Sequence, residues 1–125
     1  MKKTFAVAIS CIDGRIQIPV IEWIKTNYSV DYVDLITEPA PNKILSENKQ
    51  LELISSLRNR LKISTEKHNS RLLTLVAHAD CVSNDSSNEI QMVQIKSAKS
   101  IVESWGFDLK IIGLWVDEAF EVREF

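Results

Sequence analysis

The chain has 125 residues, of which 45% are hydrophobic and 26% are charged, and this composition is typical of one globular domain that buries its own core. The formal net charge of −2 excludes the basic surplus of a nucleic-acid-binding domain, so we expect no nucleic-acid partner. No apolar stretch approaches the roughly 18 residues of a transmembrane helix, so we expect no membrane partner. We therefore predict a single domain over residues 1–125.

The amino-terminal residues and the cysteine content indicate a cytoplasmic protein. The apolar run at residues 5–9 is shorter than the h-region of a secretion signal, which needs at least about 7 residues. Only two cysteines are present, Cys11 and Cys81, and a disulfide framework is not expected in a chain without an export signal. The simplest alternative to a functional role is that both cysteines are buried residues that only fill the core.

The first half of the chain is predicted to form two strands and two helices. Residues 4–10 are apolar or small throughout, which predicts a strand covered on both faces. Residues 17–27 follow as an amphipathic helix, and residues 30–37 alternate like a strand at or near the edge of a sheet. The two prolines in residues 37–43 predict a loop, and the apolar spacing over residues 45–66 predicts one long helix.

The second half of the chain is predicted to contain one helix and three strands. Residues 72–77 are a short, continuous apolar run, which is typical of a central strand. Residues 82–88 are polar and predict a loop with several candidate N-caps, after which residues 88–104 have the spacing of a helix. Residues 109–116 predict a further strand, and residues 120–125 alternate like a short edge strand.

This alternation of strands and helices predicts an α/β fold class, in which a mostly parallel sheet has helices on both faces and a short C-terminal edge strand. Ligands of such sheets bind beyond the carboxyl ends of the strands, where the winding direction reverses. Cys11 follows the first predicted strand, and His78 follows the third. If these two strands are neighbours at the reversal, both residues meet in one crevice.

Cys11, His78 and Cys81 together form a candidate zinc site. Two thiolates and an imidazole suit Zn²⁺, and His78 and Cys81 are close enough in sequence to reach one ion from a tight turn. Three protein ligands leave a fourth position for water, as in catalytic zinc sites. The Asp13 carboxylate can either bind that water or replace it on the metal. By holding the carboxylate, the Arg15 guanidinium can determine whether Asp13 binds the water or the metal.

Two motifs carry a resemblance to the β-class carbonic anhydrases. Residues 11–15, Cys-Ile-Asp-Gly-Arg, match the C-x-D-x-R signature of that family, and residues 78–81, His-Ala-Asp-Cys, match its H-x-x-C signature. Residues 113–117, Gly-Leu-Trp-Val-Asp, also resemble the family's last core strand. Two features depart from the pattern, since residues 37–42 replace an Arg-Asn-Ala-Gly segment and Val82 replaces a glycine.

The resemblance implies a β-carbonic-anhydrase-like fold with zinc held by Cys11, His78 and Cys81, and a catalytic dyad of Asp13 and Arg15 beside the metal. The implied reaction is the attack of zinc-bound hydroxide on carbon dioxide to give bicarbonate. Carbon dioxide and bicarbonate are then the small-molecule partners. The resemblance also implies a homodimer or a higher homo-oligomer.

Three other interpretations stay open from the sequence. The chain can be a non-catalytic zinc-binding or small-ligand-binding module in which Asp13 is the permanent fourth ligand. It can also be a metal-free regulatory domain with two buried cysteines. A phosphatase-like site with Cys11 as nucleophile and Arg15 as anion clamp is disfavoured, because the two residues are closer in sequence than in phosphate loops of that type.

Four further polar residues lie near the predicted strand and helix ends. Asp80 is expected to cap the segment that follows it. His68 is expected to lie at a solvated helix end rather than to bind a metal. Glu38 and Asn42 lie at the carboxyl end of the second strand, where they either face the crevice or belong to a proline-stiffened connection without a role in binding.

Overall fold

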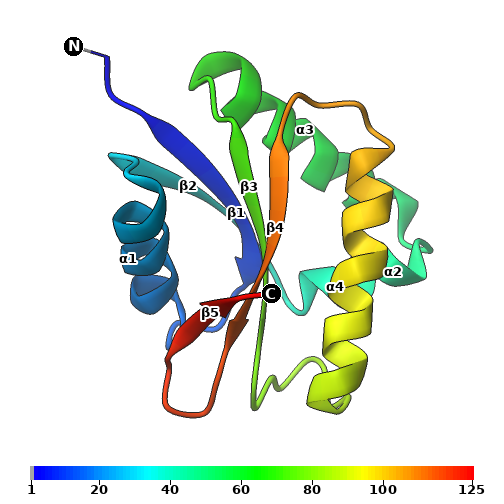
Figure 1. Cartoon of the computed structure of the whole chain (residues 1–125). Coiled ribbons are helices and arrows are strands. Elements are labelled where there is room, and N and C mark those ends of the chain that lie inside the picture. Colours follow the sequence, from blue (N-terminus) through cyan, green and yellow to red (C-terminus); the bar gives the residue numbers. More distant parts are fainter. Residues whose placement is uncertain (1) are drawn as a thin grey trace.

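The computed structural model describes residues 2–125, which form one five-stranded sheet with helices packed on both faces (Figure 1). In chain order the elements are β1 (Phe5–Cys11), α1 (Gln17–Tyr28), β2 (Tyr32–Glu38), α2 (Pro41–Glu47), α3 (Leu51–Lys67), β3 (Leu72–His78), α4 (Asn88–Glu103), β4 (Lys110–Val116) and β5 (Val122–Glu124). The strand order is β2-β1-β3-β4-β5, with the first four strands parallel and β5 antiparallel to β4. The predicted α/β fold class is therefore confirmed.

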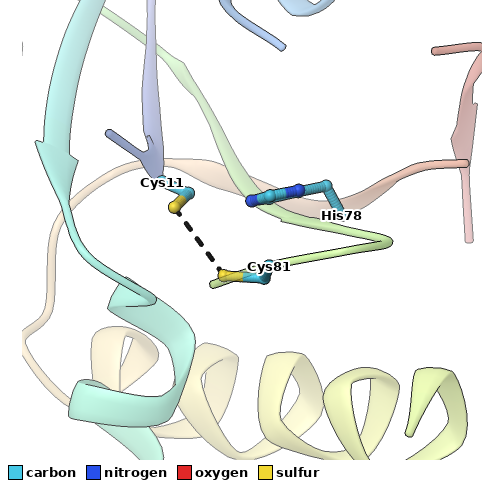
Figure 2. A group of neighbouring side chains, drawn as sticks. All are labelled: Cys11, His78 and Cys81. Atoms are coloured by element: carbon cyan, nitrogen blue, oxygen red, sulfur yellow. Dashed lines mark hydrogen bonds between the residues drawn. The ribbon is translucent and has the colours of Figure 1, made fainter. Parts of the chain in front are cut away.

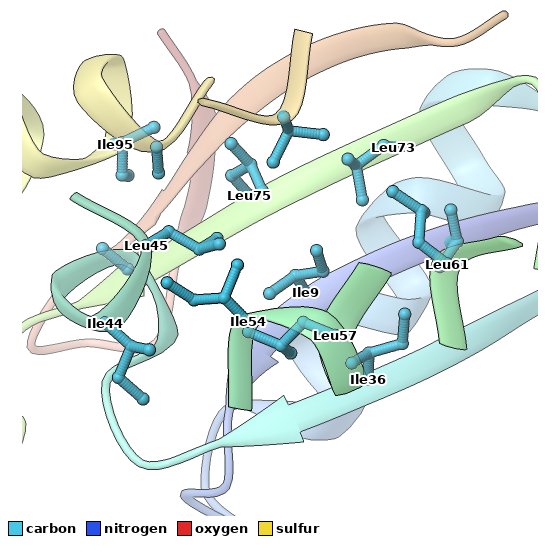
Figure 3. Close-up of a cluster of buried hydrophobic side chains, with 14 of the residues drawn as sticks. Ile9, Ile36, Ile44, Leu45, Ile54, Leu57, Leu61, Leu73, Leu75 and Ile95 are labelled. Carbon is cyan, nitrogen blue, oxygen red and sulfur yellow. The ribbon is translucent and has the colours of Figure 1, made fainter. Parts of the chain in front are cut away.

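The hydrophobic core lies in two layers, one on each face of the sheet. Helix α1 covers one face, and helices α2, α3 and α4 cover the other (Figure 1). Strand β1 contributes to both layers, because Val7 and Ile9 pack under α2, α3 and α4 whereas Ala6 and Ala8 pack under α1. Figure 3 shows Ile9 among the leucine and isoleucine side chains of the first of these layers. A strand that is apolar at nearly every position is thus buried on both faces.

The two long helices α3 and α4 each bury one face. In α3 the residues Ile54, Leu57, Leu61 and Ser64 are buried, and their spacing is that of one stripe along a helix. Helix α4 begins at the N-cap Ser87, whose side chain accepts a hydrogen bond from the Ile90 amide. No helix within residues 2–125 has the combination of length and hydropathy that crossing a bilayer requires.

The two edges of the sheet are β2 and β5. Strand β2 has partly exposed side chains along most of its length, which confirms the edge position expected from its alternating pattern. The C-terminal edge strand is also present, but it covers only Val122–Glu124 of the six residues predicted. Phe120 adopts a positive φ of 61° and donates its amide to the Asp117 carbonyl, so the start of the predicted strand is part of a turn.

The connection between β2 and β3 differs from the sequence prediction. The predicted loop over residues 37–43 and the single helix over residues 45–66 are wrong, because two separate helices, α2 and α3, occupy this region. Helix α2 begins at Pro41, in its first turn, where the missing N–H and the fixed φ of proline are tolerated. The second proline of the predicted loop therefore starts a helix instead of preventing one.

The break between α2 and α3 depends on the backbone of Asn48. This residue adopts the left-handed conformation, with φ 53°, and its N–H donates to the Ile44 carbonyl as the C-cap of α2. Asparagine is one of the few side chains that tolerate this conformation, and it commonly ends helices. The chain then changes direction before α3 starts at Leu51.

Strands β1 and β3 are neighbours in the sheet, and they separate toward their carboxyl ends. Their pairing stops at Ile9 and Leu75, whereas β1 stays paired with β2 as far as Cys11 and β3 stays paired with β4 as far as His78. The winding direction also reverses between them, because the chain moves from β1 to β2 on one side and from β3 to β4 on the other. A crevice therefore opens between β1 and β3, where such sheets bind ligands.

Candidate metal centre

Cys11, His78 and Cys81 converge in this crevice (Figure 2). Cys11 is the last residue of β1, His78 is the last residue of β3, and Cys81 follows a turn in which Asp80 has a positive φ of 56°. One potential ligand atom from each of the three residues lies within 4.8 Å of the others, and the two sulfur atoms are 3.9 Å apart. All three side chains are at least 92% buried. The arrangement can hold a metal ion.

The imidazole of His78 is oriented for binding a cation through Nε2. Its Nδ1 lies 2.8 Å from the Ala79 carbonyl oxygen, which can only accept a hydrogen bond, so Nδ1 carries the proton. In the neutral imidazole Nε2 is then the acceptor, and it is buried without a hydrogen-bond partner. A carbonyl that fixes the tautomer and orientation of a ligating histidine is a regular feature of metal sites. The orphaned Nε2 therefore fits a metal ligand.

The environment of the cluster favours a thiolate at Cys11. Burial raises the pKa of this thiol, but the adjacent His78 and backbone groups of Ala40 and Asp13 outweigh burial and lower the pKa from 9.0 to about 7. Burial and the proximity of Cys11 both raise the pKa of Cys81. A cation placed between the sulfur atoms would favour the charged form of both, because the thiolate is the form that ligates metals.

The space beside the cluster is small and lined by polar side chains. The cavity has a volume of about 10 Å³, close to that of a single water-sized sphere, so it excludes large ligands. Asn42, Asn84 and Gln91 line it together with the three donor residues. Asn42 donates its Nδ2 to the Val76 carbonyl at 2.8 Å, and its Oδ1 is buried without a partner. Asn42 therefore faces the crevice, one of the two alternatives that the sequence left open.

Asp13 and Arg15 form an ion pair next to Cys11. The Asp13 carboxylate accepts hydrogen bonds from Arg15 Nε at 3.0 Å, from Arg15 Nη2 at 2.7 Å and from the Arg15 amide at 2.9 Å. These contacts lower the pKa of Asp13 from 3.8 to about 2, so the carboxylate is ionised at neutral pH. Among the described residues, the group of donors within 4.8 Å of one another contains Cys11, His78 and Cys81 but not Asp13.

Asp80 does not act as a helix cap, contrary to the sequence prediction. Its Oδ2 accepts a hydrogen bond from Arg15 Nη1 at 3.2 Å, and its carbonyl accepts one from Nη2. Helix α4 is capped by Ser87 instead. The left-handed backbone at Asp80 turns the chain between His78 and Cys81, and its contacts link this turn to the Asp13–Arg15 pair.

Two other polar residues lie away from the cluster. Glu38 forms an ion pair with Arg60 of α3, and it is absent from the lining of the crevice. His68 is the C-cap residue of α3, as expected, and its Nδ1 lies 2.7 Å from Asp34 Oδ2. Asn84 was predicted as a loop residue and one of several N-cap candidates, and Gln91 was not singled out from the sequence. Only their polar side chains indicated that Asn84 and Gln91 could line the crevice. Their actual position could not be predicted, because it depends on how α4 packs against the sheet.

Comparisons with known proteins give a family match and a structural match. The model of a family described as "Putative carbonic anhydrase" matches residues 1–125. A crystal structure of a tetrameric β-carbonic anhydrase from the filamentous ascomycete Sordaria macrospora is similar, with a TM-score of 0.61 and 11% sequence identity, over 100% of this chain and 82% of that chain. At this identity the structural likeness shows the fold alone. No curated protein matches the chain.

Proposed function

The chain belongs to this carbonic anhydrase family, and we propose that it is a zinc-dependent enzyme that hydrates carbon dioxide to bicarbonate. The observation that supports this most directly is the convergence of Cys11, His78 and Cys81, with an orphaned imidazole nitrogen, at the reversal point of the sheet. These residues are the proposed zinc ligands. Two thiolates and an imidazole suit Zn²⁺ and leave a fourth coordination position. Bound zinc would supply an activated water as the nucleophile.

Asp13 and Arg15 are the proposed catalytic pair. Because the Asp13 carboxylate is ionised and held through both oxygens by Arg15, it keeps the capacity to accept a further hydrogen bond, and its proposed role is to orient a water beside Cys11. The same contacts hold the carboxylate away from the cluster, which favours an open fourth position over permanent ligation by Asp13. This favours the enzyme over the non-catalytic zinc module.

We also propose that the 125 residues act as one domain and that the protein assembles as a homodimer or a higher oligomer. Strand β2 supports the second proposal, because it is an edge of the sheet with backbone groups available for pairing. Tyr32 and Leu35 on this strand are 49% and 36% exposed. The structurally similar Sordaria macrospora enzyme is described as tetrameric.

The proposed function is tested by measuring zinc content and carbon dioxide hydration on the same purified protein. We expect one zinc per chain and hydration that depends on it. Asp13→Asn should keep the zinc but lower the hydration rate by about 10²-fold, the lower range for loss of a group that assists proton transfer. The matched control is Asp85→Asn, which changes an exposed carboxylate in the loop before α4 and should leave the rate unchanged.

Each alternative gives a different result in this experiment. Zinc binding without hydration in the wild-type protein would support the non-catalytic module. Absence of zinc after growth and purification with added zinc would support the metal-free domain. An Asp13→Asn variant as active as the control would remove Asp13 from the proposed catalytic pair.

A further inference from the structure

A second cavity lies at the opposite end of the sheet from the metal centre. It has a volume of about 910 Å³, compared with about 10 Å³ at the cluster, and this is the size of pockets that bind small organic molecules. Phe5 and Leu72, the first residues of β1 and β3, line it, whereas Cys11 and His78 are the last residues of the same strands. Seven-residue strands place the two sites roughly 20 Å apart. The cavity is therefore separate from the metal centre.

The lining of this cavity is strongly basic. Five of the fifteen lysine and arginine side chains of the chain line it, although the chain as a whole has a net charge of −2. These five residues are Lys2, Lys3, Lys67, Arg71 and Lys110. Among the described residues that line the cavity, none is acidic. Cationic side chains concentrated around a concave, partly apolar surface raise the local concentration of anions.

The acidic residues around the cavity neutralise only part of this charge. Asp34 is bonded to His68, and Asp31 is bonded to a neighbouring threonine and lies near Lys3. Asp108 is 3.8 Å from Arg71, and its side chain is 97% exposed, so solvent screens this contact. Within residues 2–125, none of the four lysines that line the cavity has a carboxylate within 4.0 Å. Their charges are available to a ligand.

Besides the polar side chains of Thr4 and Asn69, the rest of the lining is aromatic or aliphatic. The rings of Phe5 and His68 are stacked with their centroids 4.0 Å apart. Tyr28, Val30 and Leu72 complete the apolar part of the wall. The Lys110 ammonium lies 5.2 Å from the centre of the Tyr28 ring, which holds a positive charge directly beside an aromatic surface. A ligand that satisfies both parts of this lining has a flat apolar body and a negatively charged head.

We propose that this cavity is a binding site for a small aromatic anion, in which an aromatic body contacts the Phe5, Tyr28 and Leu72 surface and a carboxylate or phosphate group meets the surrounding lysines. The site does not depend on the metal centre or on the proposed hydratase activity, because no residue lines both cavities. A carboxylate and a phosphate are both attracted to the surrounding lysines. Two probes that differ only in this group therefore show which of the two the site prefers.

The test uses three probes with one aromatic body, 1-naphthoate, 1-naphthyl phosphate and the uncharged 1-naphthamide, titrated into zinc-supplemented protein by calorimetry. We expect at least one anion to bind about tenfold or more tightly than the amide at low salt, because the amide has no charge to attract the lysines. The preference should decrease as salt is added. Amide chemical shifts should change for residues 2–5, 67–72 and 110.

Matched variants locate the charges. Lys67→Ala and Lys110→Ala change exposed side chains of the lining and should each weaken binding of the preferred anion about threefold to tenfold. Lys62→Ala removes an exposed lysine of the same helix, α3, that does not line the cavity, and it should leave the affinity unchanged. Equal affinities for the anions and the amide would overturn the proposal. So would equal effects of the Lys62 and Lys67 variants, or chemical-shift changes confined to the metal centre.

Discussion

Asn42 supplies a hydrogen bond to the sheet at the point where β1 and β3 stop pairing with each other. Beyond Leu75, β3 has lost its pairing with β1, so the Val76 carbonyl has no strand partner on that side. Asn42, from the first turn of α2, donates Nδ2 to this carbonyl at 2.8 Å, and the residue is only 4% exposed. The side chain thereby closes the wall of the crevice and satisfies a buried acceptor, which would otherwise cost free energy.

The contribution of Asn42 can be measured. Asn42→Ala should lower the free energy of unfolding by about 1–3 kcal/mol, because the Val76 carbonyl is left buried without its donor. Urea denaturation followed by circular dichroism gives this value. Asn59→Ala, on the exposed face of α3, is the control and should not destabilise the protein, because alanine has the higher helix propensity. Equal effects of the two substitutions would contradict this role for Asn42.

The site residues differ in how far the sequence identifies them. Cys11, His78 and Cys81 were identifiable because two short motifs follow apolar runs, and parallel strands bring such ends to one edge of the sheet. Their role as zinc ligands stays a prediction until metal is measured. The position of Asn42 was not predictable, because it depends on the point at which β1 and β3 stop pairing. The residues of the two strands do not indicate where this pairing stops.

At the scale of the elements, the residues between β2 and β3 show that the spacing of apolar residues does not predict where one helix ends and the next begins. Strands β1 and β3 were predictable because nearly every position is apolar, as burial on both faces requires. The split into α2 and α3 was missed, because nothing between residues 45 and 51 is incompatible with a helix except the left-handed backbone of Asn48. This split positions α2, and therefore Asn42, over the crevice.

The role of Asn48 gives a prediction for this connection. Asn48→Val should destabilise the protein by about 1–2 kcal/mol, because a β-branched side chain is strained at a φ of 53°. Asn48→Gly is the matched variant, and it should be neutral or nearly so, because glycine adopts this conformation freely. Thermal or urea denaturation compares the two. A valine variant as stable as the glycine variant would indicate that the chain does not need the left-handed turn.

At the scale of the whole molecule, the three proposed ligands join segments that are far apart in the sequence. Cys11 and Cys81 are 70 positions apart, and their sulfur atoms are 3.9 Å apart in the folded chain. The alternation of strands and helices predicted a mostly parallel sheet, but it left open whether β1 and β3 are neighbours, and the strand order shows that they are. The alternating pattern also indicated that β2 lies at or near an edge of the sheet, and the structure places it there, whereas the assembly that we propose for this edge stays a prediction.

Removal of the metal should therefore destabilise the entire fold. A ligand that binds only the native state adds about 2.7 kcal/mol when its concentration is 100 times its dissociation constant, so chelation should lower the melting temperature by on the order of 10 °C. Differential scanning calorimetry with and without a chelator measures this shift. Cys81→Ser should bind little zinc and should not respond to the chelator. If this variant kept its metal content and its melting temperature, the proposed ligand set would be wrong.

The separation of the cluster along the chain also has a consequence for biosynthesis. A ribosome releases Cys11 long before His78 and Cys81, and neither of these reaches Cys11 until β3 has docked beside β1. A nascent chain that ends before β3 holds a single thiol and no complete coordination set. With the proposed ligand set, a zinc ion would therefore be acquired only by chains whose central strands have already assembled, and not before β3 and Cys81 have been synthesised.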